Sequence, residues 1–255
     1  MIIKTNYVAP DTGQAVFSSA LLDAYAPIEP SAWWVFGDDS SSLTDLSGNA
    51  VTLADAATTK TYGAKVVGGA YPDTGLSIGA NTTGSNEFQS DKGIPSAGFS
   101  FAVTFQKVAS AAASVFGVGV HSTAFHFYVD NNANRPRFIF AEGTSQVIQA
   151  TTTVTATTEL VVMGSCDLDG VNATFTMLFP QSSATAVTDS TTTLEATYAS
   201  HNFDIGAPFG AAYTQPLVIY EAVIYDRVMT ATQLAAEYVL LKGRMTARGL
   251  TLLDA

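Results

Sequence analysis

The chain has 255 residues, of which 47% are hydrophobic and only 13% charged, which is enough apolar material for a large buried core. Its 22 acidic and 11 basic residues give a net charge of −11 without any Lys/Arg cluster to neutralise phosphates. These numbers exclude a nucleic-acid partner and a basic membrane-binding surface, and no run of about 18 apolar residues is present for membrane insertion.

The single cysteine, Cys166, excludes an internal disulfide bond. It lies in a strand-like run, residues 160–166, with no basic neighbour that would activate a thiol, so we interpret it as an inert core residue. The first seven residues lack the basic and then apolar pattern of a secretory signal. We therefore expect synthesis in a cytoplasm, whatever the final location.

The first 30 residues form a region of their own. They contain three prolines and one short apolar patch, residues 20–25 (Ala-Leu-Leu-Asp-Ala-Tyr). Such a segment buries little surface by itself, so residues 1–30 are predicted to be an N-terminal arm that is either flexible or attached to a partner. The folded domain is predicted to cover residues 31–255.

Two adjacent tryptophans, Trp33 and Trp34, open that domain. Alternation along a strand allows at most one of them to face the core. We expect the other to pack beneath the arm or beneath a terminal helix. The alternative for these residues is an exposed platform on which a sugar ring stacks.

Apolar residues then alternate with a period of two, which predicts β-strands. The clearest strand is residues 99–105 (Phe-Ser-Phe-Ala-Val-Thr-Phe), where four apolar side chains share a face. Further strands are expected at 125–129, 138–140, 151–158, 160–165, 173–179 and 203–206, and one more between residue 217 and the helix that starts at Thr230. An Asp-Gly turn at 169–170 indicates a hairpin, and the Ser/Thr/Ala-rich residues 181–199 predict a long surface loop or an edge strand. This pattern favours a sandwich or jelly roll.

One helix is expected, from Thr230 to about residue 245. Thr230 and Gln233 have the spacing of a capping box, and Leu234, Tyr238 and Leu241 share one face. Gly243 is expected to weaken the end of this helix.

Several motifs resemble the laminin-G-like, concanavalin-A-type jelly-roll family. They are Trp-Trp-Val-Phe-Gly-Asp-Asp at 33–39, Leu-Thr-Asp-Leu-Ser-Gly-Asn-Ala at 43–50, the strand leading to 101, the strand ending in Asp-Gly at 169–170, and a last strand that runs through Tyr-Asp-Arg at 225–227 into a short helix. The resemblance extends from about residue 32 to 240. It implies an all-β, two-sheet antiparallel jelly-roll sandwich with one short C-terminal helix, and such domains usually bind or build rather than catalyse.

The turn in the second motif has a physical explanation of its own. Asp45 can accept hydrogen bonds from backbone N–H groups of the turn that it begins. Gly48 permits a positive φ, and Asn49 tolerates the left-handed conformation.

No catalytic pattern is evident. Glycosidases of this fold resemble one another in a strand with the pattern Glu-x-Asp-x-x-Glu, and no such run occurs here. The three histidines, His121, His126 and His201, lack zinc-like spacing, and their positions on a strand and in loops mark none of them as a catalytic base. We therefore expect a protein that is not an enzyme, with a glycoside hydrolase as the least favoured alternative.

Calcium is the one metal for which the loops offer ligands. Oxygen-rich stretches lie at Asp38–Asp39, at 130–132 (Asp-Asn-Asn) and at Asp167 and Asp169. Turns commonly contain Asp and Asn for conformational reasons, and the calcium ligands of the family do not map onto this sequence. We therefore predict no cofactor and no metal-binding residue.

Sugar binding would need aromatic rings on loops, beside amide or carboxylate partners. The candidates are Tyr71, Tyr198, His201, Phe209 and Tyr213. Each has the alternative role of anchoring its own loop.

These observations lead to a functional expectation. A chain that is acidic, poor in cysteine and preceded by an arm fits a structural or adhesive protein on the surface of a virus particle, most simply a bacteriophage decoration, fibre or tail component. Its expected partners are other virion proteins, contacted through residues 1–30, and host-surface glycans, and the positive mean hydropathy of +0.22 favours a homo-oligomer or a lattice. The alternative is a carbohydrate-binding module or lectin outside a virus.

Overall fold

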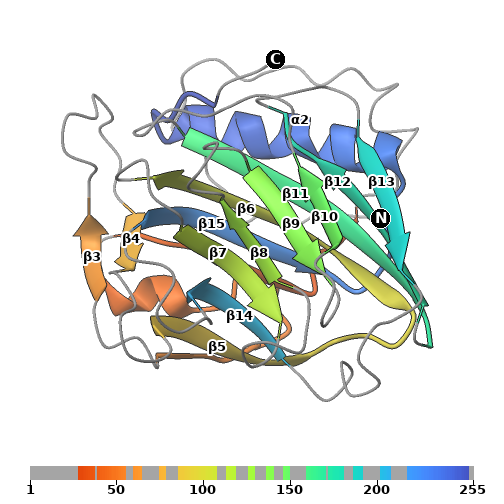
Figure 1. Ribbon diagram of the computed structural model, residues 1–255. Coiled ribbons are helices and arrows are strands. Elements are labelled where there is room, and N and C mark those ends of the chain that lie inside the picture. The colour runs from red at the N-terminus through yellow and green to blue at the C-terminus, as the bar shows by residue number, and fades with distance from the viewer. Residues whose placement is uncertain are drawn as a thin grey trace, which may run out of the picture.

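The computed structural model describes residues 28–37, 39–55, 60–64, 75–78, 86–107, 113–118, 126–129, 136–140, 146–149, 159–170, 172–180, 186–191, 202–207 and 217–252. These residues form two antiparallel β-sheets and one C-terminal α-helix (Figure 1). The predicted all-β, two-sheet sandwich with one closing helix is confirmed. No helix in these ranges is long and apolar enough to cross a membrane.

Eight of the described strands form the first sheet. They are β1 (Ala32–Val35), β3 (Lys60–Ala64), β4 (Gly75–Ile78), β6 (Gly98–Lys107), β11 (Glu159–Asp169), β12 (Asn172–Leu178), β13 (Val187–Thr191) and β15 (Leu217–Tyr225). Their order is β13-β12-β11-β6-β15-β4-β3, and β1 also pairs with β15.

Seven described strands form the second sheet. They are β2 (Leu53–Asp55), β5 (Asn86–Gly93), β7 (Ala113–Val118), β8 (His126–Val129), β9 (Pro136–Phe140), β10 (Gln146–Gln149) and β14 (Asn202–Ala207), in the order β10-β9-β8-β7-β14-β5-β2. A short 3-10 helix, η1 (Ser40–Leu43), follows β1, and the α-helix α2 (Ala231–Ala247) follows β15.

Alternation along the strands of the first sheet creates two apolar cores. On β6, Phe99, Phe101 and Phe105 face the second sheet and join the core between the sheets. Ala102 points to the opposite face and joins a second cluster beneath α2, together with Val223 of β15. The central strands of the first sheet, β6 and β15, therefore contribute to a core on each face.

The hairpin and edge predictions are confirmed. β11 and β12 pair through Asp169 and Asn172, and Gly170 between them has a φ of 62°, a conformation that glycine adopts without strain. β8 pairs with β9. Within 181–199 the described residues form the edge strand β13. Residues 151–158, predicted as a strand, lie outside the described ranges.

The two tryptophans separate as alternation predicted. Trp34 has no exposed surface and belongs to the core between the sheets. Trp33 is half-buried and packs against the cluster beneath α2, with the Arg244 guanidinium 5.5 Å from its ring centroid.

Helix α2 has the predicted capping box and ends close to the predicted position. The Thr230 hydroxyl accepts from the backbone N–H of Gln233, and the Gln233 side chain accepts from the Thr230 backbone. Gly243 lies within the helix, which continues to Ala247, and Met245 near its end is buried. The buried residues are Leu234, Glu237, Leu241 and Met245, while Tyr238 is half-buried.

A buried ion pair joins α2 to β15. The Glu221 side chain is 1% exposed, and Arg244 donates to its Oε1 at 2.9 Å from Nε and 2.7 Å from Nη2. Arg244 also pairs with Glu237 at 3.1 Å. Burial raises the pKa of Glu221 above its usual range, against the opposing effect of the Arg244 charge.

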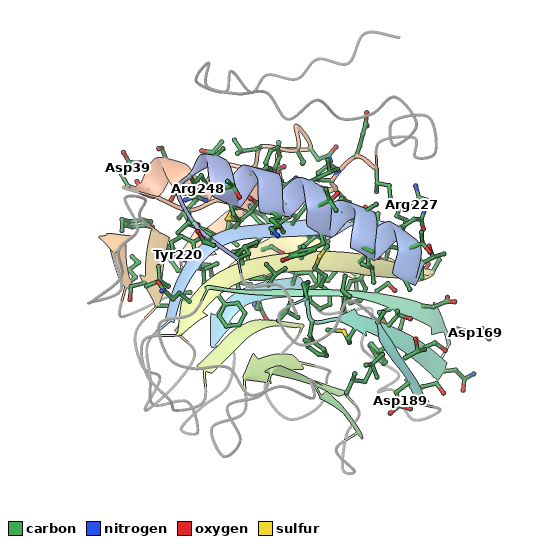
Figure 2. The ribbon with its side chains drawn as sticks, turned by 90° about the horizontal axis from the view of Figure 1, so that it is seen from above. Asp39, Asp169, Asp189, Tyr220, Arg227 and Arg248 are labelled. Atoms are coloured by element: carbon green, nitrogen blue, oxygen red, sulfur yellow. The ribbon has the colours of Figure 1, made fainter. Side chains whose placement is uncertain are left out.

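A second arginine fixes the end of the helix to a bulge in β15. The register of β15 shifts between Ile219 and Glu221. Arg248 donates to the carbonyl oxygens of Tyr220 at 2.9 Å and Phe36 at 2.8 Å, so it bridges β15 and the residue that follows β1. Figure 2 shows Arg248 beside Tyr220 at one end of α2, with Arg227 at the other end.

We predict that Arg244→Met destabilises the protein by about 3–5 kcal/mol, because it removes the cation that contacts the buried Glu221 carboxylate. Glu221→Gln should cost less, about 1–2 kcal/mol, since Arg244 keeps Glu237 as a partner. Urea denaturation at neutral pH measures both.

Arg227→Met is the matched control, because Arg227 is exposed at the opposite end of α2. Its free energy of unfolding should stay within about 0.5 kcal/mol of the unmodified protein. An Arg244→Met variant as stable as this control would contradict the anchoring role.

Candidate functional site

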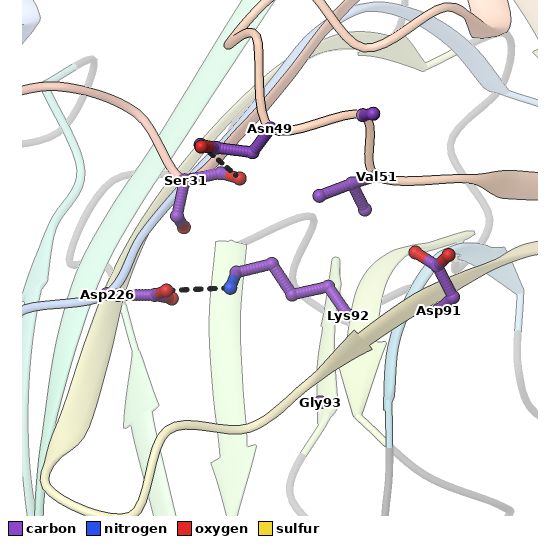
Figure 3. Close-up of a pocket in the computed structure, with 8 residues that line it drawn as sticks. Ser31, Asn49, Val51, Asp91, Lys92, Gly93 and Asp226 are labelled. Atoms are coloured by element: carbon purple, nitrogen blue, oxygen red, sulfur yellow. Dashed lines mark hydrogen bonds and ion pairs between the residues drawn. The ribbon is translucent and has the colours of Figure 1, made fainter.

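A groove of about 500 Å³ opens at one end of the sandwich, where segments from both sheets meet. It is lined by Ser31, Asn49, Ala50, Val51, Asp91, Lys92, Gly93 and Asp226 (Figure 3). Ser31 precedes β1, Asp226 follows β15, and residues 91–93 end β5. The volume lies within the usual range for small-ligand sites.

The turn after β1 builds one wall of the groove, and Asp45 holds this turn together. Its Oδ1 accepts from the backbone N–H groups of Trp33 and Ser47, both at 2.9 Å. Its Oδ2 accepts from the Val51 backbone at 3.0 Å and from the Ser47 hydroxyl at 2.7 Å. The predicted role of Asp45 as a backbone acceptor is confirmed.

These hydrogen bonds determine the charge of Asp45. Partial burial raises its pKa, but the bonds from Ser47, Trp33 and Val51 favour the ionised form more strongly, and the net pKa lies below the ordinary 3.8. The carboxylate is therefore ionised at neutral pH.

The left-handed residue of this turn is Ala50 and not Asn49. Gly48 has the predicted positive φ, 87°, and Ala50 has a φ of 55°. Asn49 does not adopt the left-handed conformation that it can tolerate, and its Nδ2 donates to the backbone oxygens of Ser31 at 3.1 Å and Pro30 at 3.2 Å. Ala50, which lines the groove, thus adopts a conformation that is unfavourable for a residue with a Cβ atom.

The opposite wall is the end of β5. Asp91 exchanges two hydrogen bonds with Thr52, one through its backbone N–H at 3.0 Å and one through Oδ1 at 2.9 Å. Oδ2 has no hydrogen bond to a described residue, and the side chain is exposed. This oxygen is available to a ligand.

An ion pair crosses the groove and joins the two sheets. The Lys92 ammonium of β5 lies 2.7 Å from Oδ2 of Asp226, which directly follows β15. The Lys92 side chain is only 15% exposed, whereas that of Asp226 is 46% exposed. The pair therefore places a held cation and an accessible carboxylate at the base of the groove.

The chemistry of the groove suits hydrogen bonding to a polyhydroxylated molecule. Asp91 and Asp226 accept hydrogen bonds, and Lys92 has two further N–H groups to donate. None of the eight lining residues is a histidine, a cysteine or an aromatic residue. A nucleophile activated by a histidine is therefore absent from the described groove.

The five aromatic candidates from the sequence, Tyr71, Tyr198, His201, Phe209 and Tyr213, all lie outside the described residues, so their predicted role is untested. The groove residues Lys92, Asp91 and Asp226 were not predicted. No local signal could identify them, because Lys92 and Asp226 are separated by 134 positions.

The calcium candidates are only partly described. Asp38 and residues 130–132 lie outside the described ranges. Oδ1 of Asp39 accepts from the Ser41 backbone and hydroxyl and so caps η1. In the described part of the chain, no three His, Cys, Asp or Glu side chains come together as metal ligands would.

Comparison with known proteins gives a fold but no family. No protein-family model matches the sequence, and no curated protein is significantly similar to it. Among solved structures, the botulinum neurotoxin type G receptor-binding domain superimposes with a TM-score of 0.57 at 10% identity, covering 84% of this chain and 52% of that one.

Two other solved structures are similar to this chain to about the same degree. Trypanosoma rangeli sialidase, in complex with a difluoro-KDN, gives a TM-score of 0.58 at 11% identity over 84% of this chain and 33% of its own. The binding domain of paraclostridial mosquitocidal protein 1 gives 0.56 at 10% identity over 83% and 52%. This chain thus spans about half or less of each neighbour, and the shared part is a concanavalin-A-like jelly roll.

We predict that Asp45→Ala destabilises the protein by about 2–4 kcal/mol, because three backbone N–H groups lose their acceptor. Urea denaturation at neutral pH measures the loss. The difference from the unmodified protein should be full above the ordinary aspartate pKa of 3.8 and should shrink as the pH falls through the lower pKa of folded Asp45.

Asp39→Ala removes a similar carboxylate from a position that is fully exposed to water, so it should have a smaller effect. Equal losses in the two variants would show that Asp45 does not organise the wall of the groove.

Proposed function

We propose that this protein is a non-catalytic binding module that holds neutral glycans of a cell or particle surface in the groove between residues 49–51 and β5. The observation that carries the proposal is the Lys92–Asp226 pair beside Asp91 in a groove of ligand size. The fold likeness to toxin receptor-binding domains is consistent with a binding role.

The charge of the groove favours a neutral ligand. Asp91 and Asp226 supply two negative charges and Lys92 one positive charge, a net −1. An anionic sugar would meet both carboxylates within contact range, where solvent screening is weakest. The structural similarity to a sialidase in complex with an acidic sugar is therefore no reason to propose an acidic sugar as the ligand of this groove.

The proposed affinity is weak. A monosaccharide of roughly a dozen heavy atoms at about −0.3 kcal/mol per atom gives about −4 kcal/mol, or a Kd near 1 mM. Useful attachment at this affinity requires several copies of the module to bind together. This agrees with the expectation of a homo-oligomer or lattice.

We predict that a glycan array displaying neutral sugars at high density detects saturable binding, and that Lys92→Met lowers the affinity at least tenfold, because a hydrogen bond to a charged donor is lost. Titration calorimetry with the best ligand, with calcium and again with chelator, measures the affinity and tests for a metal requirement.

Lys60→Met is the matched control, because Lys60 forms an ion pair with Asp55 on other strands and does not line the groove. Its binding should be unchanged. If glycan binding is unchanged in Lys92→Met but lost in Tyr71→Ala or Tyr213→Ala, the glycan-binding site would lie at the aromatic residues and not in the groove. A blank array at high protein concentration would remove the glycan proposal altogether.

A finer proposal concerns the setting. We propose that the module is a surface component of a virus particle, most simply a bacteriophage, and that residues 1–30 attach it to other virion proteins. The acidic, cysteine-poor composition and the distinct N-terminal segment support this proposal. Peptides of this chain should then appear by mass spectrometry in density-gradient-purified particles, and particles that contain capsid protein but none of these peptides would contradict it.

A further inference from the structure

The outward face of α2 is uncharged over its whole length. The helix has eight exposed residues, and all of them are Ala, Thr, Gly, Val or Leu. Val239 and Leu240, side by side at its middle, are 50% and 45% exposed. A helix at the surface of a domain normally presents charged residues to water.

The charged residues of α2 lie on its other sides. Glu237 is buried, and Lys242 and Arg244 are half-buried. Arg244 points to the sheet, where it pairs with Glu221. The helix is therefore uncharged on the side where a solvated helix carries charge, with Val239 and Leu240 at its middle, which is typical of a face that another segment covers.

The described chain begins beside this helix. Ile28 is half-buried and packs against the cluster beneath α2, to which Trp33 and Tyr238 also contribute. Three residues later, Ser31 is fixed to β15 by its backbone N–H, which donates to the Ile224 carbonyl at 2.7 Å. The segment before Ile28 is thus joined to the chain at the cluster beneath α2, the same cluster against which Tyr238, the sequence neighbour of Val239, also packs.

The preceding segment has the composition and the length to cover the face. Residues 20–25 contain Leu21, Leu22 and Tyr25 and a single charge. They lie three to eight residues before Ile28, which is about 10–26 Å of extended chain. The 17 residues of α2 span about 25 Å. The apolar stretch can therefore reach Val239 and Leu240 from its own anchor.

We propose that residues 20–25 of the same chain pack on the outward face of α2 over Val239 and Leu240. The tether favours this occupant over a second copy, because a segment joined by a few residues acts at an effective concentration in the millimolar range. This packing does not depend on glycan binding in the groove. It concerns residues 1–30, the segment that is expected to attach the module to other proteins. A partner that binds residues 1–30 would then compete with the helix.

Thiol labelling of the full-length chain tests this contact. Cys166 is 1% exposed, and burial raises its thiol pKa well above the usual value. The labelling reagent should therefore not react with Cys166 in the folded protein, and any labelling of Cys166 would indicate unfolding. Leu240→Cys places a probe on the face, and Val187→Cys places one at a comparable exposure of 41% on the edge strand β13. We expect Leu240→Cys to react at least tenfold more slowly than Val187→Cys.

Adding Leu21→Glu and Leu22→Glu to the Leu240→Cys variant should bring its labelling rate up to that of Val187→Cys, at every protein concentration. Equal rates in the two probes without the glutamates would overturn the proposal. Slow labelling of Leu240→Cys that does not change when Leu21→Glu and Leu22→Glu are added would overturn it as well. Slow labelling that becomes faster on dilution would assign the face to a second copy instead.

Discussion

The structure depends on β15, a strand with both faces buried and both edges paired. It pairs with β6 along one edge, while β4 and β1 share the other on either side of the bulge at Tyr220. Its apolar residues serve both cores, and its one carboxylate, Glu221, lies in the face beneath α2. A buried carboxylate requires a cation, and the helix that follows immediately in sequence supplies Arg244. This requirement fixes how α2 lies on the sheet.

The same strand positions the groove. Asp226 follows β15 directly, and Lys92 reaches it from the second sheet. Ser31 is bonded to Ile224, and Asn49 is bonded to Ser31, so the turn that forms the other wall is tied to this strand as well. The walls of the groove are therefore held by hydrogen bonds that exist without a ligand, which reduces the entropy lost on binding.

Sequence reasoning predicted those features that local patterns encode. Alternation gave β6, the β11–β12 hairpin and the opposite orientations of Trp33 and Trp34, and the Thr230–Gln233 spacing gave the start of α2. It failed where tertiary contacts decide. In the turn held by Asp45 the left-handed residue besides Gly48 is Ala50, while the Asn49 amide donates to the distant Ser31 and Pro30. The groove combines three distant segments, which no local motif records.

The unusual polarity of α2 follows from the same constraint. Only 13% of the chain is charged, and the helix directs its few charged residues inward or sideways, where Glu221 needs a cation and the β15 bulge needs a donor for its carbonyl groups. The outward face is then left to small and apolar residues. Exposed Val and Leu do not stabilise a helix in water, so the stability of α2 comes from Leu234, Leu241 and Met245 beneath it. The proposed cover on the outer face would add apolar burial above a helix that is already anchored on its sheet side by the Arg244–Glu221 pair and by Leu234 and Leu241.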